Sequence, residues 1–88
     1  MDPKNFETEL VREGYEVSKS VTPGAKVNPE HSHPFDVKAL VLQGAMSLTR
    51  DGKTETYTVG QTFSMPRGCT HYESYGDGET VTLVGRKH

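Results

Sequence analysis

The sequence has a single cysteine, Cys69, so it cannot form an internal disulfide. Its longest uninterrupted apolar run is ALVL at residues 39–42, which is far shorter than the roughly 20 residues that a membrane-spanning helix needs. The N-terminal residues include Asp2, Lys4 and Glu7 in place of an apolar signal region. We therefore expect a cytoplasmic protein that makes no contact with a membrane.

Basic residues are neither abundant nor clustered. Ten lysines and arginines stand against twelve acidic residues, giving a net charge of -2, which argues against nucleic acid or an anionic membrane as a partner. A chain of 88 residues has room for one core and hence one domain. Because a small core without disulfides is marginal, a metal ion or a partner subunit is expected to add stability.

The chain is predicted to begin with a short helix over roughly residues 3–13. Asp2 can cap its first turn, and Pro3 suits the first helical position. Phe6 and Leu10 recur at helical spacing, so one face of this helix is apolar.

After this helix the pattern is that of an all-β protein. Short runs rich in valine and threonine are separated by glycine and proline turns. Asp51 and Gly52 lie between two such runs and predict a two-residue hairpin turn. We therefore expect one domain over residues 1–88, with a helical segment at 1–14 and a β-barrel at 15–88.

Residues 37–42 predict a strand that is buried on both sides. Alternation places Val37, Ala39 and Val41 on one face, and Lys38, Leu40 and Leu42 on the other. One apolar face belongs to the interior of a barrel or sandwich, and the other must be buried against a further part of the protein. Either the N-terminal helix or a second subunit could cover it, and we expect a homodimer.

His31 and His33 are the first candidates for a metal site. Residues two apart in a strand point to the same face, about 6.5–7 Å apart, so both imidazoles can reach one ion. Such a pair is also common on a solvated surface. A third histidine, His71, follows a Pro66 and Gly68 turn.

The spacing of these residues resembles the two motifs of the cupin family. Gly60, Pro66, Gly68 and His71 fit the second motif, while His31, His33 and Gly44 fit the first, from which Gly24 departs by one residue. The resemblance covers about residues 20–85. It implies a double-stranded β-helix, the cupin jelly-roll barrel, and a divalent transition metal (Fe, Mn, Ni, Zn or Cu) bound by the three histidines.

Two positions depart from the family pattern. The glutamate of the first motif, usually the fourth ligand, falls on Val37, and the asparagine of the second falls on Tyr75. Glu73 shares strand parity with His71 and could replace the missing ligand, or it could orient a histidine by a hydrogen bond.

Other possibilities remain open for the fourth position. Asp36 could reach the site only if a bulge rotated its side chain inward. Cys69 lies in the turn, where it could be a thiolate ligand or a small buried side chain. The site could instead keep three protein ligands and open positions, which resembles the iron site of cysteine dioxygenase, itself a cupin. The metal could also be lost.

Strand parity predicts the cavity wall as well. The side chains expected to point inward are Phe35, Val37, Ala39, Val41, Phe63, Met65 and Tyr75. Most are expected to pack the core, and Val37, Phe63 and Tyr75 are the candidates for substrate contact. Tyr72 and Glu55 have outward parity.

Two classes of function fit this sequence. The first is a small metal-dependent enzyme, dioxygenase- or isomerase-like, that acts on a small molecule. The second is a binding or sensing protein without chemistry, in which the metal site is degenerate or absent. Both classes share this fold, so the fold cannot choose between them.

Overall fold

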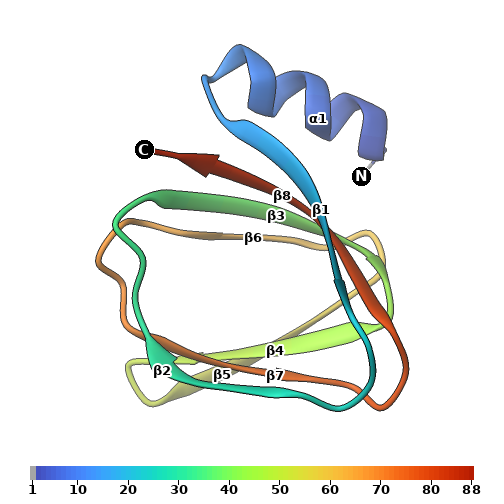
Figure 1. The fold of residues 1–88 in the computed structure, drawn as a ribbon, viewed down its shortest axis with the longest axis vertical. Coiled ribbons are helices and arrows are strands. Elements are labelled where there is room, and N and C mark those ends of the chain that lie inside the picture. The colour runs from blue at the N-terminus through green and yellow to red at the C-terminus, as the bar shows by residue number, and fades with distance from the viewer. Residues whose placement is uncertain (1) are drawn as a thin grey trace.

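The computed structural model describes residues 2–88, which form one helix and eight strands (Figure 1). The elements are α1 (Pro3–Arg12), β1 (Glu16–Thr22), β2 (Val27–His31), β3 (Asp36–Gln43), β4 (Ala45–Arg50), β5 (Lys53–Thr58), β6 (Thr62–Met65), β7 (His71–Tyr75) and β8 (Thr80–Lys87). The expected all-β fold with a short N-terminal helix is therefore confirmed.

The strands form two antiparallel sheets that face each other (Figure 1). One sheet has the order β1-β8-β3-β6 and the other β2-β7-β4-β5. The chain crosses repeatedly from one sheet to the other, as in a jelly roll. The space between the sheets holds the main core, formed by Val37, Ala39, Val41, Met46, Leu48, Phe63, Met65 and Val84, with Phe35, Tyr57 and Tyr75 packed against it. All seven side chains expected to point inward belong to this set.

Helix α1 begins and ends where the sequence predicts. The Asp2 side chain accepts a hydrogen bond of 2.9 Å from the backbone nitrogen of Lys4, and Pro3 is the first helical residue. Gly14, with φ of 88°, turns the chain into β1. Across residues 2–88, no helix is long and apolar enough to cross a membrane.

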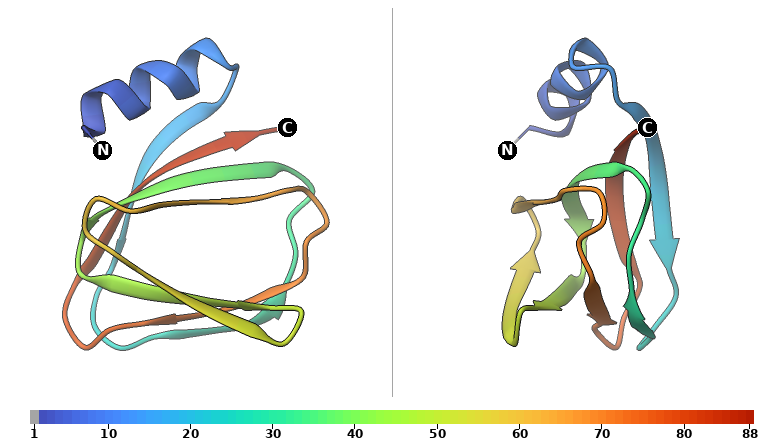
Figure 2. Two further views of the ribbon diagram at one scale, coloured as in Figure 1. Left: turned by 180° about the vertical axis from the view of Figure 1, so that it is seen from behind. Right: turned by 90° about the vertical axis from the view of Figure 1, so that its left-hand side faces the viewer.

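Helix α1 covers the outer face of the first sheet. Phe6 and Leu10 pack against Leu40 and Leu83 in a second apolar cluster, and the rotated views show the helix on one side of the barrel only (Figure 2). Gly85 permits this close approach, because a Cβ there would lie 2.8 Å from Leu10 Cδ1. The strand with two apolar faces is thus covered by the helix, and this face lends no support to the homodimer, which stays a prediction.

Two glycine turns hold the strand register. Asp51 and Gly52 have φ values of 52° and 72° and join β4 to β5, which confirms the predicted hairpin. Gly44 connects β3 to β4 with φ of 78°, and a Cβ there would meet the Glu79 carbonyl oxygen at 2.7 Å. Only glycine fits this position without a backbone shift.

Candidate metal centre

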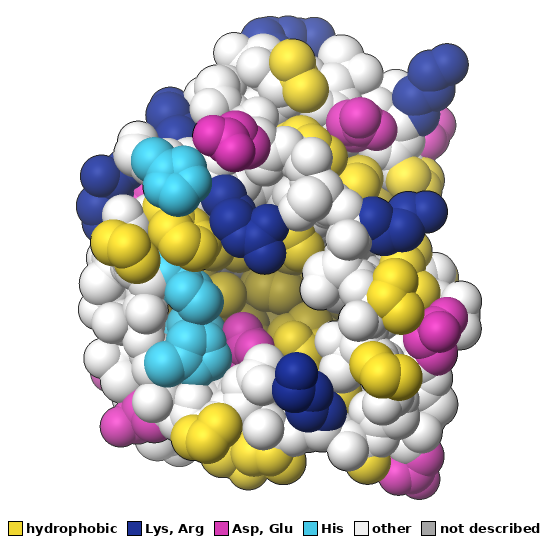
Figure 3. Space-filling view, viewed as in Figure 1, with side chains coloured by type: hydrophobic (Ala, Val, Ile, Leu, Met, Phe, Trp, Pro, Cys, Tyr) yellow, Lys and Arg dark blue, Asp and Glu magenta, His cyan; other side chains and the backbone are white. Residues whose placement is uncertain are grey.

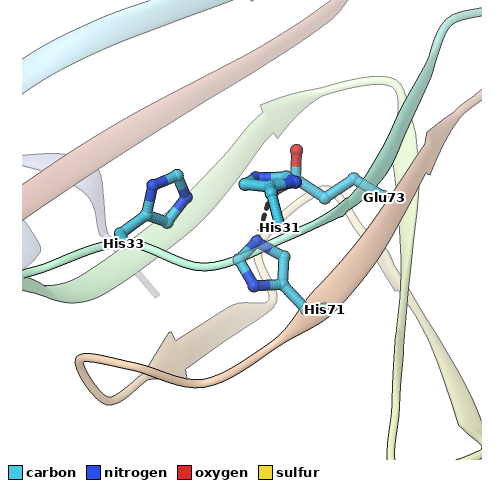
Figure 4. Close-up of side chains that lie close together, drawn as sticks. All are labelled: His31, His33, His71 and Glu73. Atoms are coloured by element: carbon cyan, nitrogen blue, oxygen red, sulfur yellow. Dashed lines mark hydrogen bonds and ion pairs between the residues drawn. The ribbon is translucent and has the colours of Figure 1, made fainter.

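His31, His33, His71 and Glu73 lie together, with one possible ligand atom from each, all within 4.8 Å of one another (Figure 4). His31 ends β2 and is paired in register with His71, which begins β7. The rings of these two histidines are 4.3 Å apart, and that of His33 is 4.8 Å from His31. The structure therefore brings together the three histidines and Glu73, four of the six residues that the sequence suggested as possible ligands.

A bulge in β2 determines which of its side chains face this group. Asn28 pairs with Glu73 and His31 with His71, so three steps along β2 match two along β7. In a regular strand, residues three positions apart such as Asn28 and His31 point to opposite faces of the sheet, and the bulge brings both to the same face. Pro29 lies inside the bulge, and β2 is an edge strand, where a missing N–H costs no ladder bond.

Backbone carbonyls orient two of the histidines. His31 Nδ1 lies 2.7 Å from the Pro29 oxygen, and His71 Nδ1 lies 3.0 Å from the Cys69 oxygen. A carbonyl can only accept, so each Nδ1 carries a hydrogen. The Nε2 atom of each ring is left to bind a metal, in the arrangement typical of metal-bound imidazoles.

Glu73 is held on both of its oxygens. Oε1 accepts hydrogen bonds from Asn28 Nδ2 at 2.7 Å and from the Tyr75 hydroxyl at 3.2 Å. Oε2 lies 3.1 Å from His71 Nε2. His71 is 1% exposed and Glu73 8%, so this contact is nearly closed to water.

The contact between His71 and Glu73 tests whether these residues fit a metal. Because the hydrogen on His71 Nδ1 points to Cys69, Nε2 and the Glu73 oxygen face each other as two acceptors. Such a pair needs a cation, either a metal ion or a second proton. Two ligand atoms at about 2.1 Å from one ion would lie about 3.0 Å apart at an octahedral angle and about 3.4 Å apart at a tetrahedral one, and the 3.1 Å found here falls between these values.

The electrostatics of the site favour neutral donors. Burial, followed by the charges of His31 and His71, lowers the pKa of His33, which keeps this imidazole unprotonated and able to bind an ion. Burial and the neighbouring Glu73 raise the pKa of Tyr75 to about 12. Tyr75 therefore keeps its hydroxyl hydrogen and donates it to Glu73.

The two other acidic or thiol candidates lie outside this group. Asp36 accepts a hydrogen bond of 2.9 Å from the backbone nitrogen of Arg67 and faces its guanidinium. The Cys69 thiol contacts the Thr70 carbonyl at 3.9 Å, and Cys69 serves the site through its backbone oxygen. Within residues 2–88, Glu73 is the carboxylate that joins the three histidines.

A cavity of about 300 Å³ opens beside the group. In the space-filling view its floor is apolar, histidines form one wall, and basic side chains lie at the rim (Figure 3). Val37, Phe63 and Tyr75, the candidates for substrate contact, all line it. Tyr72 and Glu55 are exposed on the outside, as their parity predicted.

Among the polar residues of this cavity that sequence reasoning missed are Asn28 and Arg86. Asn28 was hidden by the bulge, which breaks the alternation of β2. Arg86 lines the cavity with Thr82 and Val84, and the alternation of these three residues along β8 was a signal that could have found it.

Comparisons with known proteins agree with this geometry. Among curated proteins, none matches this sequence. Among solved structures, a protein of unknown function from Rhizobium leguminosarum bv. viciae 3841 has a TM-score of 0.78 at 20% identity, over 85% of this chain and 71% of that one. A cupin-2 domain protein from Shewanella frigidimarina NCIMB 400 has a TM-score of 0.69 at 17% identity, over 84% and 71%.

An enzyme also shares this barrel. The DMSP lyase DddQ from Ruegeria pomeroyi DSS-3 has a TM-score of 0.74 at 20% identity, over 84% of this chain but 38% of its own. At these identities the likeness concerns the fold. A family model described as a cupin domain matches residues 18–84, a range that includes His31, His33, His71 and Glu73. By this match and by its barrel, the chain belongs to the cupin family.

Proposed function

We propose that His31, His33, His71 and Glu73 bind one divalent transition-metal ion, and that the protein uses it to bind a small molecule in the adjacent cavity. The observation that carries this proposal is the 3.1 Å approach of His71 Nε2 to Glu73 Oε2. Both are acceptors when His71 donates to Cys69, and an ion between them satisfies both.

Three nitrogens and one oxygen form a donor set that suits Fe, Mn, Ni, Zn or Cu. When bound, such an ion supplies Lewis-acid or redox chemistry to a small molecule. One carboxylate cancels only part of its charge, so the site stays attractive to an oxygen donor. The reaction class that we propose is metal-dependent, dioxygenase- or isomerase-like, with Val37, Phe63 and Tyr75 as substrate contacts.

The protein's own side chains have defined parts in this scheme. Asn28 and Tyr75 fix Glu73 by hydrogen bonds to Oε1, which leaves Oε2 directed at the ion. The apolar floor of the cavity, which includes Val37 and Phe63, excludes water from one side of the bound molecule. His33, on the loop after β2, is half-buried, lines the cavity, and has Phe35 stacked on it at 4.9 Å.

A second function has its own observation. The 3.1 Å between His71 Nε2 and Glu73 Oε2 is also the length of a hydrogen bond, so a second proton on His71 would satisfy this pair without an ion. The protein would then be a non-enzymatic binding or sensing cupin, with the same cavity as its ligand site.

Elemental analysis of protein purified without a tag or chelator separates the two functions. We expect about one equivalent of a transition metal per chain, lost in His33→Ala and retained in His88→Ala. His88 is the matched control, because it is the one histidine outside the group. No uptake after reconstitution with each of the five ions would overturn the metal site and leave the binding function.

A further inference from the structure

The cavity beside the metal group has an excess of positive charge. Its charged lining residues are Lys26, Glu73 and Arg86, although the chain as a whole carries a net charge of -2. Glu73 is engaged by the histidines and Asn28, which leaves two cationic side chains facing the open volume. A concentration of positive charge inside a net-negative protein is a specific feature of this cavity.

Arg86 is the better placed of the two. It lies on β8 with the same parity as Thr82 and Val84, and it is half-buried, whereas Lys26 is exposed. Its Nη1 donates a hydrogen bond of 2.8 Å to Ser18, which fixes the guanidinium and leaves other N–H groups to bind a ligand.

Aromatic stacking connects Arg86 to the metal group. The guanidinium carbon is 6.0 Å from the centre of the Phe35 ring, and Phe35 stacks on His33 at 4.9 Å with an angle of 18° between the rings. The Phe35 ring therefore lies between the Arg86 guanidinium and His33, one of the proposed metal ligands.

Arg86 has no acidic partner in the described part of the chain. The ion pairs of residues 2–88 join Lys38 to Glu13, Arg67 to Asp36 and His71 to Glu73. Glu16 lies opposite Arg86 in the register of β1 and β8 but forms no ion pair with it. A half-buried guanidinium without an acidic partner, on the wall of a cavity, is a site for an anion.

We propose that the small molecule bound in this cavity is an organic anion whose carboxylate is bound by Arg86. This inference rests on the proposed function, because the other end of the molecule lies toward the histidine and glutamate group. The cavity of about 300 Å³ is at the lower end of the range for ligand sites, so the anion is small. Hydroxyls of Ser20, Thr22 and Thr82 on the same wall add neutral hydrogen-bond partners.

The test is a binding titration against matched pairs of small molecules. Acetate, lactate, succinate and citrate are each compared with the corresponding neutral amide, by calorimetry or NMR, on metal-free and on metal-loaded protein. We expect at least one carboxylate to bind at least tenfold more tightly than its amide. Arg86→Gln should weaken that binding by about 10- to 100-fold, because a charge-assisted bidentate contact is lost.

Two variants control for charge and for folding. Arg86→Lys keeps the charge but loses the planar fork, so it should retain part of the affinity. Arg12→Gln removes one positive charge from the exposed end of α1 and should change the affinity by less than twofold. Circular dichroism of each variant verifies that the barrel is intact.

The outcomes separate this inference from the proposed function. Normal metal uptake with no preference for any carboxylate, or with a preference that Arg86→Gln leaves unchanged, overturns the anion site and leaves the metal site standing. Arg86-dependent carboxylate binding by a protein that takes up no metal supports the anion site and overturns the metal proposal.

Discussion

Asn28 donates a hydrogen bond of 2.7 Å from Nδ2 to Oε1 of Glu73 and so joins the bulged edge strand to the strand that carries His71. The bond is part-buried, and it joins the cross-strand pair of β2 and β7 next to the paired histidines. It holds the carboxylate in the orientation in which its second oxygen meets His71.

Asn28→Ala is therefore expected to weaken metal binding by about 10- to 100-fold, the usual cost of losing a partner that orients a ligand. Competition with a chromogenic chelator measures the affinity. Asn5→Ala, at an exposed position of α1, is the matched control and should bind as the native chain does. Equal affinity of both variants would show that Tyr75 alone is sufficient to orient Glu73.

Glu73→Gln tests whether this carboxylate binds the ion directly. If it does, removing its charge should lower the coordination number by one, as measured by X-ray absorption on the loaded protein. Glu55→Gln, an exposed residue of β5, should leave the spectrum unchanged. An unaltered coordination number with weaker affinity would mean that Glu73 acts only by orienting His71.

Gly85→Ala is expected to loosen the packing of the helix on the sheet. The added Cβ would lie 2.8 Å from Leu10 Cδ1 and 3.2 Å from Tyr15 Cβ, and overpacking of this kind costs about 1–3 kcal/mol. Urea denaturation measures this decrease in the free energy of unfolding. Gly78→Ala meets no atom within 4 Å and should shift the free energy of unfolding by less than about 0.5 kcal/mol.

The pair formed by Asp36 and Arg67 is expected to give a small dependence of stability on pH. Hydrogen bonds from the Arg67 side chain and backbone lower the pKa of Asp36. A lowered pKa in the folded state means that the stabilisation is present above the unfolded value, near 4, and is lost as pH falls below it. Because the Asp36 side chain is 33% exposed, solvent screens its charge and the effect is modest.

Melting temperatures of the native chain and Asp36→Asn, compared at pH 6 and pH 3, check this prediction. The native chain should be the more stable at pH 6, and the difference should shrink at pH 3. A difference that is the same at both values would contradict the assigned role of the carboxylate charge.

The parts of the fold that depend on local pattern were predictable from sequence. The capped helix, the hairpin at Asp51 and Gly52, and the shared inward face of His71 and Glu73 all follow from backbone preferences and the two-residue period of a strand. The contact of Glu73 with Tyr75 follows from the same parity.

What escaped prediction depends on contacts between distant segments. The sequence left open whether α1 or a second subunit covers Leu40, because the answer depends on where the helix packs. Asn28 was not predicted because a bulge interrupts the two-residue alternation of β2, and no residue type is specific to a bulge. Arg86 escaped because its role depends on which face of β8 borders the cavity.

The bulge between Asn28 and His31 makes the chemistry of this protein depend on local backbone conformation as well as on residue identity. These two residues are three positions apart, so regular alternation through residues 29 and 30 would turn either the asparagine or the histidine to the solvent side. Every donor would still be encoded, yet the donors could no longer meet. A substitution at 29–30 that abolished the bulge would therefore break up the site, while the barrel, whose core lies elsewhere, would still form.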